Sequence, residues 1–154
     1  MKKSLFFAVF SLFLVFVTIR SQACTSAIIT GKVTANGKPL LWKHRDTGQE
    51  QNRIAYFNTG KYDFLALVDA PDKGEAAWIG TNKAGFSIMN TASYNLKDDQ
   101  VEDMDHEGKL MFRALEICAD LEDFERFLDT LSRPMRVEAN FGVIDALGGA
   151  AYYE

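Results

Sequence analysis

The sequence predicts an α+β fold for residues 24–154, built from antiparallel strands and two helices. Residues 24–91 carry short apolar runs separated by Gly, Asn and Pro, which is the pattern of a strand meander. Apolar residues then recur at helical spacing between positions 110 and 131. Strand-like runs return at 141–145 and 150–153, on either side of a Gly-Gly turn. Together these patterns indicate one domain with a β-rich first part and helices inserted before the last strands.

Residues 1–23 have the order of a secretory signal peptide. Lys2 and Lys3 form a basic start, an uncharged and mostly apolar run follows at 5–19, and Ser21-Gln22-Ala23 supplies small residues around a cleavage point. The run is short for a membrane span, which usually needs about 20 residues. We therefore expect cleavage after Ala23 and a periplasmic or secreted protein with no stable membrane span; an uncleaved anchor is the alternative.

Charge argues against nucleic acid as a partner. The formal charge of the whole chain is −4, and cleavage would remove Lys2, Lys3 and Arg20 but no acidic residue, giving −7. An acidic domain of this kind lacks the basic patch that a phosphate backbone or an anionic lipid surface rewards.

Six strands are expected in the first part of the mature chain. Asn36-Gly37 is a strong two-residue hairpin signal, since both positions tolerate positive φ. The expected strands cover residues 25–29, 40–42, 54–57, 64–68, 76–79 and 86–89.

The helical part begins after an acidic stretch at 96–108, which we interpret as a solvated loop because calcium-loop spacing is absent. The first helix places Met111, Leu115 and Cys118 on one face. Asp120 is the expected N-cap of a second helix that runs to about residue 131, with Pro134 ending it. The last strand pattern stops at Glu154 with no polar tail, so we expect the complete protein to continue beyond it.

Cys24 is the candidate nucleophile. Cleavage after Ala23 would give it a free α-amine with a pKa near 8, able to take the thiol proton and later return it. His44 and His106 offer no convincing Cys-His pair, and no zinc-type spacing exists, so we expect no metal or cofactor. Lipidation of Cys24, a disulfide to Cys118 and an inert structural cysteine are the alternatives.

Three segments together resemble a known family. They are Cys24-Thr25-Ser26, residues 41–46 (LWKHRD) and residues 80–90 (GTNKAGFSIMN). This combination resembles the N-terminal-nucleophile (Ntn) hydrolases, and within them the linear-amide group of choloylglycine hydrolases, penicillin V acylases and acyl-CoA:aminopenicillanate acyltransferases. Residues 140–154 are similar to the family's mid-domain hairpin. The resemblance implies an αββα sandwich of antiparallel sheets, of which residues 24–154 would be the N-terminal part.

The resemblance also implies roles for five residues. Cys24 matches the nucleophile, Asp46 the aspartate that contacts its amine, and Asn90 a side-chain donor of the oxyanion hole. The family arginine before that aspartate is displaced or replaced here, so either Lys43 or Arg45 would tune the thiol or bind substrate. A strand-end cap is the simpler role for Asn90, and a surface turn pair for Arg45 and Asp46.

The resulting hypothesis is a hydrolase of linear amides that works through a thioester on Cys24. Acyl transfer to another amine is the same chemistry. Alternatives are a dipeptidase of the same superfamily and a non-catalytic, lipid-anchored binding domain. The expected partner is a small-molecule amide, and homo-oligomer formation stays open. Trp42, Trp78, Tyr94 and Phe141 are candidates for an acyl pocket, although aromatic residues among strands are more often core.

Overall fold

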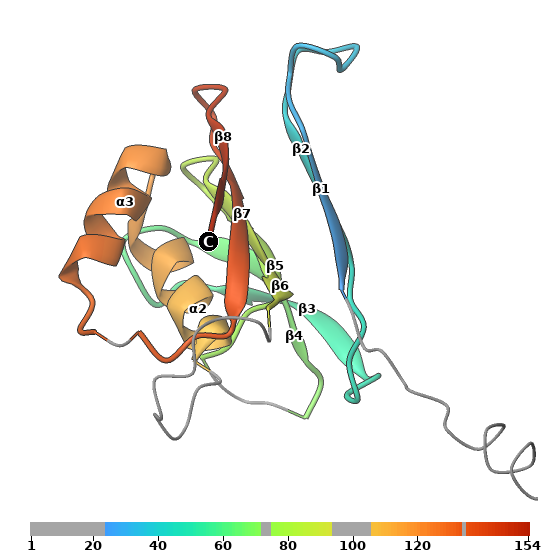
Figure 1. The fold of residues 1–154 in the computed structure, drawn as a ribbon, viewed down its shortest axis with the longest axis vertical. Helices are drawn as coiled ribbons and strands as arrows, with labels where there is room; N and C mark the ends of the chain where they lie inside the picture. Colours follow the sequence, from blue (N-terminus) through green and yellow to red (C-terminus); the bar gives the residue numbers. More distant parts are fainter. Residues whose placement is uncertain (1–23, 72–74, 94–105, 134) are drawn as a thin grey trace, which may run out of the picture.

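The computed structural model describes residues 24–71, 75–93, 106–133 and 135–154, and it has the expected α+β architecture (Figure 1). Two strands, β1 (Thr25–Ile29) and β2 (Leu40–His44), form a separate antiparallel hairpin. None of the described helices is long and apolar enough to span a membrane. The remaining strands form one six-stranded sheet: β3 (Asn52–Phe57), β4 (Phe64–Asp69), β5 (Ile79–Asn82), β6 (Ser87–Ala92), β7 (Ala139–Ile144) and β8 (Ala150–Tyr153).

The meander predicted over residues 24–91 is confirmed from β3 onward, but β1 and β2 pair only with each other and lie outside the six-stranded sheet. Its strands lie in chain order, and every neighbouring pair is antiparallel. Alternation along β4 separates its two faces, because successive side chains of a strand point to opposite sides. Phe64, Ala66 and Val68 are buried on one face, whereas Leu65 is half-exposed on the other.

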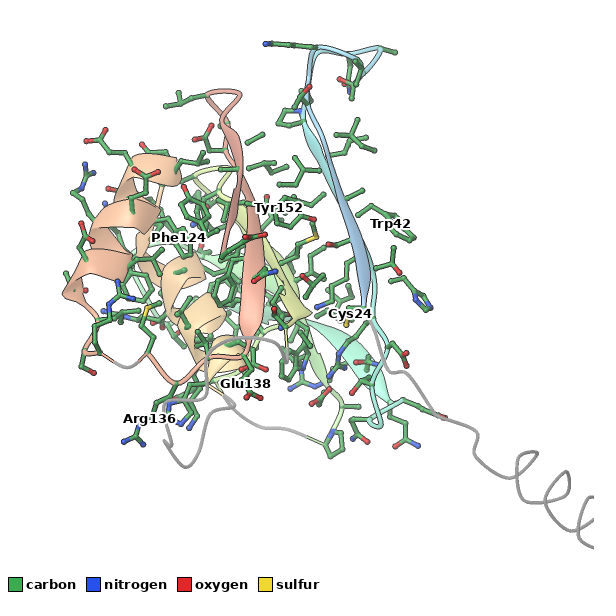
Figure 2. All side chains as sticks on the ribbon, in the orientation of Figure 1. Cys24, Trp42, Phe124, Arg136, Glu138 and Tyr152 are labelled. Atoms are coloured by element: carbon green, nitrogen blue, oxygen red, sulfur yellow. The ribbon has the colours of Figure 1, made fainter. Side chains whose placement is uncertain are left out.

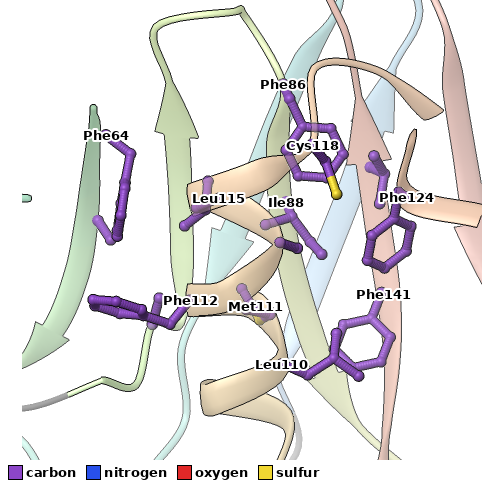
Figure 3. Packing of buried hydrophobic residues seen from close by; sticks show 14 of the residues in the cluster. Phe64, Phe86, Ile88, Leu110, Met111, Phe112, Leu115, Cys118, Phe124 and Phe141 are labelled. Atoms are coloured by element: carbon purple, nitrogen blue, oxygen red, sulfur yellow. The ribbon is translucent and has the colours of Figure 1, made fainter. Parts of the chain in front are cut away.

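The helices α2 (Glu107–Ile117) and α3 (Leu121–Thr130) cover one face of this sheet (Figure 1). Their apolar sides meet the buried strand residues in one core, where Met111 and Leu115 of α2 lie over Phe86 and Ile88 (Figure 3). Asp120 caps α3 as predicted, since its side chain accepts a hydrogen bond of 2.8 Å from the backbone N–H of Asp123.

The β1–β2 hairpin packs on the opposite face, over β6 and β7, so the molecule has three layers. In its register Ser26 lies opposite Lys43, and both point toward the large sheet. Ser26 Oγ lies 2.7 Å from the Tyr152 hydroxyl of β8, which fixes the hairpin to the far edge of that sheet. Trp42 has the other parity and is 50% exposed on the outer face (Figure 2).

Two strand predictions were wrong in detail. We expected a strand over 76–79, but β5 begins only at Ile79, because the Ala77 N–H donates to Gly108 O of α2 instead of to a strand. The β1–β2 connection is also longer than a two-residue turn. Gly37 alone takes a positive φ, of 70°, while the Asn36 side chain accepts from the Lys38 N–H. The hairpin forms as predicted, but without the tight turn.

Several predictions fall outside the described residues. They concern the signal peptide at 1–23, most of the acidic stretch at 96–108, Tyr94 and Pro134. Both helices are confirmed with small boundary differences. The first ends at Ile117, with Cys118 as its C-cap, and the second ends at Thr130.

Candidate active site

Cys24 lies immediately before β1, at the end of the hairpin where β2 finishes (Figure 2). It has the same strand parity as Ser26, so its side chain is directed toward the large sheet. The Cys24 thiol is partly buried and lies 3.7 Å from the backbone carbonyl oxygen of Asp46, which accepts its weak hydrogen bond. The first turn after β2 therefore borders the candidate nucleophile.

Lys43 points into the layer between the hairpin and the large sheet. Its ammonium donates to two oxygens: Asn90 Oδ1 at 2.5 Å and the backbone oxygen of Trp78 at 3.1 Å. The last β5–β6 pair is Ile79 with Met89, so the next residues outward are Trp78, just before β5, and Asn90 of β6. The ammonium thus joins β5 and β6 just where their own pairing ends.

The surroundings of Lys43 lower its pKa from 10.5 to about 8. Burial is the main cause, because it penalises the charged form. The charge of Cys24 raises the pKa of Lys43, the Arg45 guanidinium lowers it and Glu107 raises it, in decreasing order of effect. Lys43 and Cys24 are therefore electrostatic neighbours across the hairpin.

Arg45 has different partners. Its guanidinium forms an ion pair of 2.7 Å with Asp69 and also donates to Asn52 Oδ1. It lies over the Trp78 ring at 4.6 Å from the centroid, a cation–π arrangement. Asn52 and Asp69 face each other at the end of the β3–β4 pair. Arg45 therefore fastens the segment after β2 to this end of the large sheet.

Asn90 lies within β6, opposite Phe141 of β7, and is 5% exposed. This position is inside the strand and not the strand-end cap that we considered. Its Oδ1 accepts from Lys43. Lys43 therefore occupies the oxygen end of this amide and leaves its Nδ2 end to other partners. Nδ2 is thus the end of the Asn90 amide that could donate to a bound group.

The structure brings four of the five predicted residues together and places the fifth beside them. Cys24, Asp46, Lys43 and Asn90 form a chain of contacts, while Arg45 is bound to Asp69 and Trp78. The Cys24 thiol meets Asp46 at its main-chain oxygen. Sequence reasoning missed Asp69 as the partner of Arg45, although an acid ending an apolar strand is a usable signal.

The second cysteine lies in the helix-side core. Cys118 is 1% exposed, and burial raises its pKa to about 12. Both cysteines are free thiols, so the structure contains no disulfide between them. His44 is exposed at the end of β2 and has the opposite strand parity to Lys43. Phe141 belongs to the core, and Trp78 is covered by Arg45.

An apolar groove of about 450 Å³ runs beside this site, between β2 and the uncovered face of β3–β5. It starts at Leu41, two residues from Lys43, and at Ile79, next to Trp78. Ile54, Leu65 and Leu67 continue its lining. No group of three or more potential metal ligands occurs among the residues that the structure describes.

Comparison of the chain with protein-family models, curated proteins and solved structures finds no match.

Proposed function

We propose that the protein hydrolyses linear amide bonds with Cys24 as an N-terminal nucleophile. The observation that carries this proposal is the convergence of Cys24, Lys43 and Asn90, which are far apart in the sequence, at one end of the hairpin. A thiol, a cation and an amide donor are groups that acyl transfer through a thioester can use.

The reaction begins when signal removal frees the α-amine of Cys24. This amine takes the thiol proton, and Sγ attacks the carbonyl carbon of the substrate amide. The carbonyl oxygen becomes an oxyanion, which the Asn90 Nδ2 group and a backbone N–H stabilise. The C–N bond then breaks, and the leaving amine takes the proton from the α-ammonium. Water attacks the thioester in a second round, releasing the carboxylic acid and restoring the thiol.

The three-layer arrangement supports the proposed sandwich only in part. The described chain supplies one helical layer, the six-stranded sheet and two strands of a second sheet. We propose that these are three of the four layers of an αββα sandwich. The apolar groove beside the site supports an apolar acyl group on the substrate.

The decisive experiment uses the protein exported with its own signal peptide. Intact mass should begin at unmodified Cys24; added lipid mass would support the lipid-anchored binding domain instead. The protein is then tested on penicillin V, glycocholate, a fatty-acyl amide and a dipeptide. We expect Cys24→Ser and Cys24→Ala to abolish turnover of whichever amide is cleaved, with Cys118→Ala as the matched control. Retained turnover in both Cys24 variants would refute the proposal.

A second variant tests the amine separately from the sulfur. A chain that keeps Ala23 in front of Cys24 has the thiol but no free α-amine on that residue. We expect such a chain to lose amide hydrolysis, because the proton shuttle is blocked. Full activity with Ala23 retained would show that another group is the base.

A further inference from the structure

We propose that Lys43 is a positioning residue, whose ammonium holds Oδ1 of Asn90 and thereby presents the Nδ2 donors of that amide to the oxyanion. This inference rests on the proposed function. It assigns to Lys43 a role in orienting the oxyanion donor, separate from any effect on the thiol.

The two ends of a carboxamide have opposite hydrogen-bonding roles. Asn carries an acceptor oxygen and a donor NH₂ of similar size, and their placement is set by hydrogen bonding. An oxyanion hole works only if the donor end faces the developing charge, since the oxygen end would repel it. A lysine ammonium has three donors and no acceptor, so it bonds only the oxygen end. The 2.5 Å contact from Lys43 to Asn90 Oδ1 selects one of the two orientations.

The ammonium is itself held in place. Its second hydrogen bond, of 3.1 Å, goes to the backbone oxygen of Trp78, whose own N–H is bonded to Leu67 O of β4. The position of the Lys43 nitrogen is therefore defined by the sheet as well as by Asn90. Arg45 is not available for this task, because its guanidinium is bound to Asp69 and Asn52 and lies over the Trp78 ring.

Loss of the Lys43 proton should remove the preference for one orientation of the Asn90 amide. A neutral amine has a lone pair and can accept a hydrogen bond from the NH₂ end of Asn90, so both amide orientations become possible. The charged groups that act on Lys43 are Cys24 before β1, Arg45 after β2 and Glu107 of α2. With its pKa lowered to about 8, mainly by burial, Lys43 would lose its proton in an accessible range.

The first test reads the amide directly, without catalysis. In ¹⁵N-labelled protein the Asn90 side-chain NH₂ signals are assigned by their absence from Asn90→Asp. We expect them to titrate with a midpoint near pH 8 in the wild type and to lose that titration in Lys43→Met and Lys43→Arg. The exposed Lys83, in the turn between β5 and β6, gives the control Lys83→Met, which should titrate like the wild type. Unchanged signals in Lys43→Met, or no titration in the wild type, would overturn the proposal.

The second test is a double-mutant cycle on whichever amide of the panel is hydrolysed. We expect Lys43→Met and Asn90→Ala each to lower kcat by about 10²–10³-fold, the range for one oxyanion donor, with KM nearly unchanged. The double variant should be no slower than Asn90→Ala, since Lys43 acts through that residue. If the two decreases in kcat multiply in the double variant, the proposal is overturned. Lys43→Arg should recover most of kcat.

The tests separate failure of this inference from failure of the proposed function. If no amide is hydrolysed but the Asn90 signals titrate in the wild type and not in the Lys43 variants, the hydrolase proposal fails. The contact between Lys43 and Asn90 is then still supported. If Lys43→Met does not unfold cooperatively in urea, the wild-type titration and Lys43→Arg still decide the question.

Discussion

Removal of the Lys43 charge should change how stability depends on pH. The pKa of this lysine falls from 10.5 in a free side chain to about 8 in the folded protein, chiefly through burial. Between these two values the unfolded chain binds a proton that the folded chain does not, so the free energy of unfolding rises with pH across this window. At about 1.4 kcal/mol per pKa unit, the rise amounts to about 3 kcal/mol.

The assay is urea unfolding at several pH values from about 7 to 10.5, on the wild type and on Lys43→Met. Titrating groups that do not act on Lys43, including Tyr153, are common to both chains and cancel in the difference. The difference in unfolding free energy should grow by about 3 kcal/mol in favour of the wild type as pH rises. Lys83→Met, which removes an exposed lysine, should run parallel to the wild type. Parallel curves for wild type and Lys43→Met would refute the burial of this charge.

Two further predictions concern the thiols and the last hairpin. Iodoacetamide near pH 8 should add one group, on Cys24, because Cys118 is buried with a pKa of about 12; rapid double labelling of the folded chain would contradict this. Asp145→Ala should lower the free energy of unfolding by about 3 kcal/mol or more, since its carboxylate accepts three backbone N–H groups. These belong to Leu121, Leu147 and Gly149. Asp129→Ala, at an exposed site, should change it by less than about 0.5 kcal/mol, and equal losses would refute the reasoning.

The sequence predicted the sheet well because its signals are local. Alternation along β4 and the Gly-containing turns are decided by neighbouring residues, so the order of β3 to β6 was predicted, whereas the separation of β1 and β2 into their own hairpin was not. The start of β5 was missed for the opposite reason. Ala77 and Trp78 read as strand, yet their N–H groups bond to Gly108 O and Leu67 O, and the first of these partners is 31 positions later in the chain, on α2. A local sequence pattern does not reveal a hydrogen-bond acceptor that lies so far along the chain.

In the candidate site, too, the partners that decide each residue's role are distant in the sequence. Lys43 and Arg45 are two positions apart, so strand parity directs both toward the same layer, and no sequence pattern separates their roles. Their partners lie on different strands: Asn90 on β6 for Lys43, and Asp69 on β4 for Arg45. Only the order of strands in the sheet, which places these partners at the end of the hairpin, distinguishes the two cations.

The different contacts of Arg45 and Lys43 follow from the chemistry of the two cations. A guanidinium offers a planar fork that stacks on a ring and keeps its charge, which suits the fixed contacts of Arg45 with Asp69 and Trp78. An ammonium is a compact donor whose pKa responds to burial, which suits the contact of Lys43 with Asn90. Arg45 holds the segment after β2 against the large sheet, and Lys43 two residues earlier can then reach between β5 and β6. In this arrangement the fixed cation places the strand, and the titratable one places the amide that would meet the oxyanion.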